Sequence, residues 1–261
     1  MGPPAGSTVK ITVLISGSGT NLQALINAIH DEKLDAKIVR VISNRKNAYG
    51  LQRAEQAKIP TEYHNLLQYK KTHHSTDEGV QAAREEYDAQ LAKKVLDDRP
   101  DLICCLGFLH VLSRQFLDPI YAAQVKIINL HPALPGQFNG SVSIASRLGC
   151  YKAGLTFVRR MLKETQNAIE RAHAEWMESK ITKTGVMIHE VIPEVDMGTP
   201  ILVREIPFVE GEDENIEVFE KKLHSVEWEA VVEGTGTAIK EFLRERGVSA
   251  DLQVNHDLEQ A

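Results

Sequence analysis

Short apolar runs alternate with amphipathic stretches between Val9 and Leu130, and this alternation predicts strands and helices in turn. The expected strands are Val9–Ile15, Lys37–Ser43, Thr61–Asn65, Asp101–Gly107 and Lys126–Leu130. The expected helices begin near Leu22, run from Tyr49 to Lys58, and follow the four-residue spacing of Ala83, Tyr87, Leu91 and Val95. Strands that alternate with helices in this way favour an α/β domain with an open, mainly parallel sheet.

The third predicted helix also carries charged side chains that fall outside its apolar repeat. These are Arg84, Glu85, Asp88, Lys93 and Lys94. All five lie off the buried face of the helix, and we interpret Arg84 as a solvated charge by default.

The pattern changes after His131. Two further strands, Lys183–Pro193 and Pro200–Phe208, flank a turn that carries Asp196, and they predict an appended antiparallel hairpin. A helical apolar set follows, made up of Ile216, Phe219, Leu223, Val226, Ala230, Ile239 and Phe242. We expect one domain over residues 9–246, a disordered N-terminus at 1–8 and a polar tail at 247–261.

Composition narrows the classes of partner. The chain has 261 residues, 43% of them hydrophobic, which is enough to bury a sizeable core. A net charge of -6 without a basic stripe argues against nucleic acid and anionic membranes, and favours small molecules as ligands. Three cysteines form neither a disulfide framework nor a metal set, and the N-terminus lacks a signal-peptide pattern, so we expect a cytoplasmic protein without a metal.

Candidate chemistry is concentrated where the strand Lys126–Leu130 ends. Asn129 and His131 stand two residues apart, and Pro132 favours an extended backbone at His131, so their side chains point to the same side. In open α/β sheets, ligands bind at the carboxyl ends of such strands. The alternative is a core asparagine followed by an ordinary loop histidine.

A glycine-rich turn joins the first strand to the first helix. It reads Ser16-Gly17-Ser18-Gly19-Thr20-Asn21 and presents backbone N–H groups at a helix N-terminus, where an anion such as phosphate is favoured. Leu22 stands where the dinucleotide fingerprint has a third glycine, and the lysine of a Walker A loop is missing. The alternative is a tight connection without a ligand.

A hydrophobic loop, Phe108–Leu112, follows the fourth strand at the same edge of the predicted sheet as Asn129. Exposed apolar side chains at this edge favour a flat, apolar ligand. His73 and His74 lie in a polar connection without further ligands at metal spacing, so we interpret them as surface residues.

Five separated motifs carry a resemblance to a known family. They are ISGSGTNLQAL, SNRKNAYGLQRAEQAKIP, LGFLHVLS, NLHPALPG and GVMIHEVIPEVDMGTPIL, spread over Lys10 to Phe242. The chain resembles the phosphoribosylglycinamide (glycinamide ribonucleotide) formyltransferases, purine-pathway enzymes within the folate-dependent formyltransferase family. The resemblance implies a single Rossmann-like domain and transfer of a formyl group from 10-formyltetrahydrofolate, a co-substrate, to 5-phosphoribosylglycinamide. The alternatives are another 10-formyltetrahydrofolate-using transferase or hydrolase, or a catalytically silent folate- or nucleotide-binding module.

The resemblance also implies residue roles. Asn129, His131 and Asp196 are the catalytic set, in which Asn129 and His131 stabilise the formyl oxygen and the carboxylate raises the pKa of His131. His189 corresponds to a second histidine near the site. Ser18, Gly19, Thr20 and Asn21 match the positions that bind the substrate phosphate, and Glu227 matches the acid that holds the glycinamide end. Arg84, Leu109, His110, Val111, Leu112 and Asn129 match the folate-binding positions.

Three departures from the family pattern stand out. Leu109-His110 replaces a common methionine-arginine pair, and Met187 replaces a small polar residue. The largest departure is the segment Ser141–Gln166, which interrupts a family segment that otherwise runs from Gly140 directly to Asn167. A translated intervening sequence or a tolerated surface insertion would both produce it, and a lid over the folate site is the functional alternative.

Overall fold

The computed structural model describes residues 8–138 and 168–247. Its strands are β1 (Val9–Ile15), β2 (Ala36–Ser43), β3 (Thr61–Tyr63), β4 (Leu102–Cys105), β5 (Lys126–His131), β6 (Lys183–Glu190) and β7 (Pro200–Pro207). Its helices are α1 (Thr20–His30), α2 (Tyr49–Gln56), α3 (Leu66–Thr72), α4 (Asp77–Asp97), α5 (Arg114–Ala122), α8 (Ala168–Met177) and α9 (Ile216–Glu245). Residues 1–7 of the expected N-terminus at 1–8, the segment Ser141–Gln166, and residues 248–261 of the expected tail at 247–261 lie outside the described residues.

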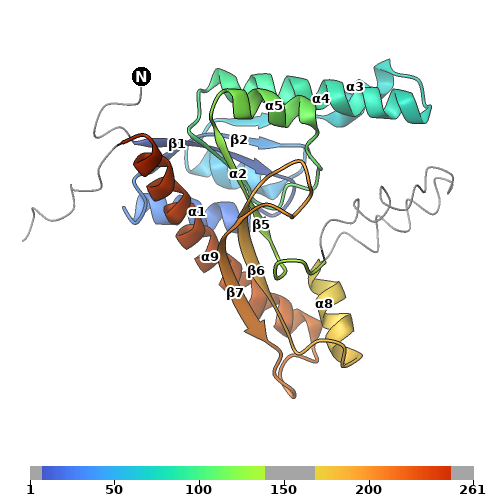
Figure 1. The fold of residues 1–261 in the computed structure, drawn as a ribbon, viewed down its shortest axis with the longest axis vertical. Helices are drawn as coiled ribbons and strands as arrows, with labels where there is room; N and C mark the ends of the chain where they lie inside the picture. Colours follow the sequence, from blue (N-terminus) through green and yellow to red (C-terminus); the bar gives the residue numbers. More distant parts are fainter. Residues whose placement is uncertain (1–7, 139–167, 248–261) are drawn as a thin grey trace, which may run out of the picture.

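All seven strands form one sheet in the order β3-β2-β1-β4-β5-β6-β7. The first five are parallel to one another, whereas β6 is antiparallel to β5 and β7 is antiparallel to β6 (Figure 1). The predicted strands and the mainly parallel α/β class are therefore confirmed. The hairpin is not an appendage, because β6 pairs directly with β5 and extends the same sheet.

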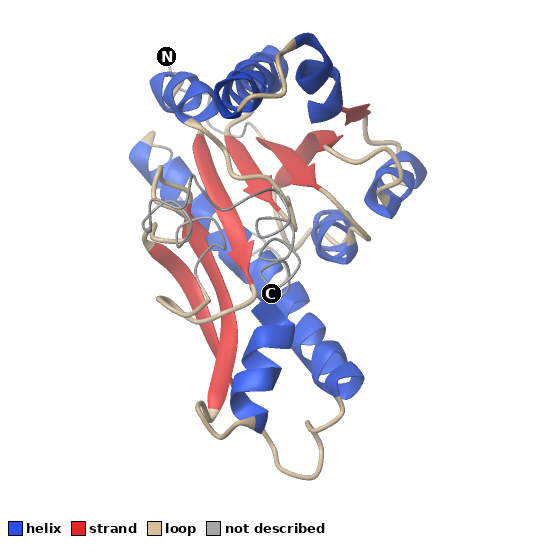
Figure 2. Ribbon diagram, turned by 90° about the vertical axis from the view of Figure 1, so that its right-hand side faces the viewer, coloured by secondary structure: helices blue, strands red, loops and turns tan. Residues whose placement is uncertain are grey.

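Helices cover both faces of the sheet (Figure 2). On one face, side chains from α1, α2, α8 and α9 pack on the sheet around Leu22, Leu25 and Phe219. On the other, α4 and α5 pack around Tyr87, Leu91 and Phe116. Within the described ranges, none of the helices combines the length and the apolar character needed to cross a membrane.

The strand order places a topological switch point between β1 and β4. The chain moves from β1 outward to β2 and β3, then returns to place β4 on the other side of β1. The loops that follow β1 and β4 therefore diverge, and a crevice for ligands opens between such loops. The glycine-rich turn follows β1, the loop Phe108–Leu112 follows β4, and Asn129 lies on β5, the next strand.

Asp88 lies off the apolar repeat of α4, as expected, but the structure buries it. It is fully buried in α4, whereas its helix neighbours Glu85 and Lys93 are at least partly exposed. Its carboxylate lies 2.7 Å from Nε2 of His110 and accepts the backbone N–H of Ser113 at 2.8 Å. A buried carboxylate is stable only with such partners, and the apolar repeat of a helix does not indicate them.

The sequence pattern did not predict α3 and α5. The side chain of Asn65 caps α3 by accepting the N–H of Leu67 at 2.9 Å, and no residue of this short helix is buried. The helix α5 contains Pro119 but buries Phe116, Leu117 and Ile120 against α4 and the sheet. Tertiary packing, which a periodicity argument does not see, stabilises α5.

Gly234 sets the distance between α9 and β6, which gives a stability prediction. A Cβ at Gly234 would lie 2.6 Å from Cγ1 and 2.9 Å from Cβ of Ile188, whereas a Cβ at Gly236 would meet only Leu34 Cδ2 at 3.1 Å. Both glycine-to-alanine changes gain the same helix propensity. We therefore expect Gly234→Ala to be less stable than Gly236→Ala by about 1–3 kcal/mol, the usual cost of overpacking, in urea unfolding. Equal stability of the two variants would contradict this packing account.

Candidate active site

Asn129 and His131 are brought together by the last residues of β5. They alternate with Leu130 along an extended strand, so their side chains lie on the same side of the sheet. Antiparallel pairing places His189 of β6 directly opposite Asn129, with Asn129 Nδ2 3.1 Å from His189 Nε2. His189 Nδ1 donates to the carbonyl of Glu190 at 2.8 Å, so its Nε2 accepts from the amide. His189 therefore orients the Asn129 side chain.

His131 is almost fully buried, at 8% exposure, and acceptors face both of its ring nitrogens. Nε2 donates to the carbonyl of Gln137 at 3.3 Å, and Nδ1 lies 3.8 Å from a carboxylate oxygen of Asp196. Burial nevertheless lowers the pKa of His131 below its usual range, and this outweighs the opposing effect of Asp196. The expectation of a raised pKa is therefore wrong in its net direction, although the carboxylate acts in the expected sense.

Asp196 lies in the turn between β6 and β7. Its backbone adopts the left-handed region with φ 56°, which aspartate tolerates better than most residues. Two residues later, a Cβ at Gly198 would lie 1.7 Å from the carbonyl oxygen of Glu190, so only glycine lets the turn pass this close. The carboxylate thereby reaches both His131 and His189, at 3.8 and 3.6 Å.

The predicted phosphate turn leads directly into α1. Gly19 occupies the N-cap with φ 70°, and a Cβ there would lie 2.5 Å from Cα of Gly50 at the start of α2. Both constraints require glycine at position 19. The first-turn N–H groups of a helix lack intrahelical partners and attract anions. Thr20 and Asn21 begin this turn, and Ser18 is exposed beside them.

Glu227 extends from α9 to the phosphate turn. Its side chain is buried and accepts hydrogen bonds from Asn21 Nδ2 at 3.2 Å and from His224 Nδ1 at 2.9 Å. The hydrogen bond to Glu227 raises the pKa of His224. Among the residues that the structure describes, the buried Oδ1 of Asn21 has no hydrogen-bond partner. A donor on a bound ligand would satisfy it.

The predicted folate-binding residues gather around the loop after β4. The Arg84 guanidinium donates to the carbonyl of Val111 at 3.4 Å, and Leu109 exposes 52% of its surface. The backbone N–H of Leu109 donates to Oγ of Ser16 at 2.7 Å, and this hydroxyl donates to Asn44 at 2.7 Å. Ser16 therefore joins the folate loop to the phosphate turn.

Sequence reasoning missed Ser16, His224 and the pairing of Asp88 with His110. The spacing of His224 and Glu227, three residues apart on a predicted helix, was a usable signal for their contact. Ser16 and Asp88 gave no comparable signal, because their partners lie far away in the sequence.

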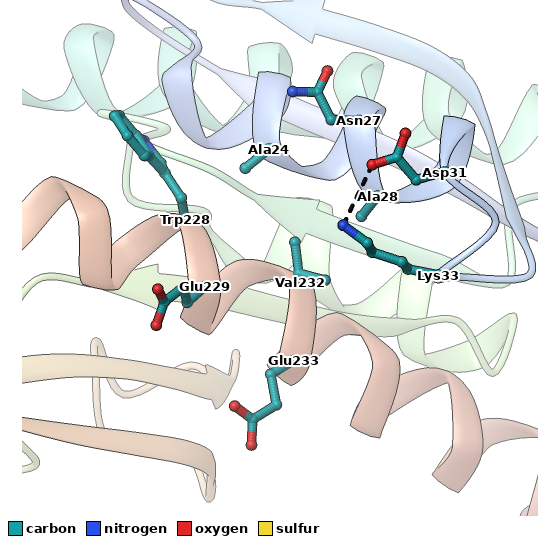
Figure 3. Close-up of a pocket in the computed structure, with 9 residues that line it drawn as sticks. All are labelled: Ala24, Asn27, Ala28, Asp31, Lys33, Trp228, Glu229, Val232 and Glu233. Carbon is teal, nitrogen blue, oxygen red and sulfur yellow. Dashed lines mark hydrogen bonds and ion pairs between the residues drawn. The ribbon is translucent and has the colours of Figure 1, made fainter.

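A hollow between α1 and α9 is separate from these residues (Figure 3). It is lined by Ala24, Asn27, Ala28, Asp31, Lys33, Trp228, Glu229, Val232 and Glu233. None of these residues belongs to the predicted site. Across residues 8–138 and 168–247, no group of three or more His, Cys, Asp or Glu side chains is arranged to hold a metal ion.

The structure is that of a single α/β protein whose sheet has a switch point of the kind at which such folds bind small ligands. A family model described as formyl transferase matches residues 9–235, so the chain belongs to the formyl transferase family. This confirms the resemblance that the sequence motifs indicated.

The relatives agree with this assignment. Phosphoribosylglycinamide formyltransferase of Schizosaccharomyces pombe is 43% identical over 220 residues, covering 84% of this chain and 91% of its own. The Saccharomyces cerevisiae protein of that name is 40% identical over 237 residues, covering 89% of this chain and 98% of its own. The crystal structure of glycinamide ribonucleotide transformylase 1 from Symbiobacterium toebii superposes with a TM-score of 0.67 at 25% identity, covering 90% of each chain.

The contact between Asp196 and His131 gives a pH prediction. Asp196→Asn removes the largest influence that raises the pKa of His131, so we expect this pKa to fall further. At pH values between the folded-state pKa of His131 and its unfolded-state pKa of about 6.5, His131 is protonated in the unfolded chain but neutral in the folded chain. The free energy of unfolding therefore falls as the pH drops below about 6.5, until His131 is protonated in the folded chain as well. In Asp196→Asn, whose His131 pKa is lower, this fall continues to a lower pH.

Histidine ring resonances followed by NMR over pH give the measurement. Glu194→Gln, which removes an exposed charge from the same turn, is the matched control. A His131 titration that is the same in Asp196→Asn, in the control and in the unmodified chain would refute the pairing.

Proposed function

We propose that this chain transfers the formyl group of 10-formyltetrahydrofolate to the glycinamide amine of 5-phosphoribosylglycinamide, a step of de novo purine biosynthesis. One observation carries the proposal. A single edge of the sheet holds an anion-binding turn, an amide–imidazole–carboxylate set and an exposed apolar loop, in a chain of the formyl transferase family. The names of the fungal relatives support the same reaction.

The phosphorylated substrate is held from the α1 side. The backbone N–H groups of Gly19, Thr20 and Asn21, with Ser18 beside them, receive the phosphate at the helix N-terminus. Glu227 attracts the glycinamide end through its buried carboxylate. The Oδ1 atom of Asn21 then gains a donor from the substrate, which supports the fit.

The folate is held from the other side of the crevice. Its residues are Arg84, the segment Leu109–Leu112 and Asn129. Arg84 supplies a positive charge that suits the carboxylates of a folate, and the exposed Leu109 supplies apolar contact. When bound, 10-formyltetrahydrofolate supplies the formyl group that is transferred.

Asn129 and His131 act on charge and protons at the reaction centre. The Asn129 amide has two N–H groups, so it donates one to His189 and retains one for the formyl oxygen as that oxygen becomes negative. Burial lowers the pKa of His131, so its charged form readily gives the departing folate nitrogen the proton that the ring has taken from the attacking amine. Asp196 and His189 fix the positions of these two side chains.

Small molecules are the substrates in this proposal, and no metal takes part. We place the reaction in the cytoplasm. The buried thiols of Cys104 and Cys105 are both unpaired, as is usual in a reducing compartment.

Formyl transfer measured by tetrahydrofolate release tests the proposal directly. We expect release only with both substrates present. Replacing Asn129 or His131 by alanine removes a group that stabilises the transition state, so kcat/KM should fall by the equivalent of about 2 to 4 kcal/mol.

Asn27→Ala and His30→Ala are matched controls, because both residues are exposed on α1 and neither is a predicted site residue. They should retain normal turnover. Folate binding without any transfer would instead favour the silent binding module. Release that proceeds without phosphoribosylglycinamide would favour a hydrolase.

We also propose that the segment Ser141–Gln166 is dispensable. Arg171 lies over the Phe138 ring at 4.9 Å, so the two flanks are close. In a chain that lacks this segment, Asn139, Gly140 and Asn167 join Phe138 to Ala168. We expect this shorter chain to be at least as stable and as active as the full chain. A second variant with a glycine–serine segment of equal length separates sequence from length. Loss of turnover in both variants would assign the segment to the mechanism.

A further inference from the structure

His110 belongs to the predicted folate loop, but its side chain points into the protein. The ring is only 5% exposed and contacts the edges of Tyr87 and Phe108, with ring centroids 4.9 and 5.9 Å away. Its neighbour Leu109 is 52% exposed. The buried His110 ring therefore does not reach a ligand that binds against the exposed side of the loop.

The inward orientation joins His110 to Asp88. A carboxylate only accepts hydrogen bonds, so Nε2 of His110 donates to Asp88 Oδ1 across 2.7 Å. The second oxygen of Asp88 accepts the backbone N–H of Ser113 at 2.8 Å. One buried carboxylate thus holds both ends of the segment from His110 to Ser113.

The same helix makes a third contact with the loop. Arg84 lies one turn before Asp88 in α4, and its guanidinium donates to the carbonyl of Val111. On the β1 side, Ser16 accepts the N–H of Leu109. The segment is therefore held through the backbone at positions 109, 111 and 113 and through the His110 side chain, by α4 and by the turn after β1.

The Asp88 contacts are the ones that cannot be replaced by water. Asp88 is fully buried, and removal of a partner from a buried carboxylate leaves an uncompensated charge. The loop must then rearrange until the carboxylate finds another donor. Leu109 and Val111 flank His110, so such a rearrangement displaces the segment that faces the crevice.

We infer that His110 is a positioning residue for the folate site: through Asp88 it holds the backbone of Leu109–Leu112 in the conformation that receives the flat heterocycle of the folate. This inference rests on the proposed function. It assigns to His110 an indirect role and adds Asp88 to the residues on which folate affinity depends.

Three variants separate positioning from general stability. His110→Leu removes the donor, and Asp88→Asn, which is nearly isosteric, replaces one of the two acceptors by an N–H. His110→Gln keeps an N–H donor. His73→Leu is the matched control, because His73 pairs with Glu86 of the same helix at 3.5 Å but lies outside the loop.

Two measurements are made on each folded variant, after thermal unfolding has verified the fold. They are the KM values for both substrates and the affinity for tetrahydrofolate by calorimetry. We expect His110→Leu and Asp88→Asn to raise the KM for 10-formyltetrahydrofolate and weaken tetrahydrofolate binding by roughly tenfold or more, the scale of a lost buried hydrogen bond. The KM for phosphoribosylglycinamide should change little. His110→Gln should recover most of the folate affinity, and His73→Leu should match the unmodified chain.

The outcomes distinguish this inference from the proposed function. If the unmodified chain neither binds tetrahydrofolate nor transfers formyl groups, the proposed function fails and the inference with it. If the unmodified chain is active and folded His110→Leu and Asp88→Asn keep a normal KM for 10-formyltetrahydrofolate, the inference alone is overturned. Equal increases in both KM values would likewise overturn it, because positioning of the folate loop predicts a selective effect.

Discussion

The antiparallel pairing of β6 with β5 is the constraint on which the candidate active site depends. It sets His189 opposite Asn129, so that a histidine orients the amide, and it returns the chain to place Asp196 beside His131. A slip of one residue in this register would turn every side chain of β6 to the other face of the sheet. The hairpin therefore belongs to the site as well as to the sheet.

Burial and the charge of Asp196 shift the pKa of His131 in opposite directions. Burial lowers its pKa, and Asp196 raises it, with burial the larger effect. The ring is thus held neutral more readily than a free histidine but remains next to a carboxylate that stabilises its charged form. Because these two effects oppose each other, the pKa of His131 depends on the carboxylate of Asp196 staying beside the ring. At the phosphate turn the balance differs, because a hydrogen bond to buried Glu227 raises the pKa of His224.

The sequence predicted the features that depend on local pattern. Apolar runs located β1, β2, β4 and β5, and the extended Asn129–His131 segment and the glycine turn emerged from spacing and backbone preference. Features that depend on distant partners were not predictable in this way. Periodicity placed Asp88 off the buried face of its helix, since only the fold brings His110 and Ser113 to its carboxylate. The contact between Asn129 and His189 required the strand register, and Ser16 required the loop after β4.

In the proposed function, separate segments at one edge of the sheet serve a single reaction centre. A crystal structure of the chain with phosphoribosylglycinamide and a folate analogue that cannot transfer its formyl group tests this most directly. We expect the phosphate at the N-terminus of α1, the heterocycle against Leu109–Leu112, and the reacting carbon beside Asn129 and His131. A structure in which either ligand binds elsewhere, or in which Asn129 and His131 contact neither ligand, would contradict it.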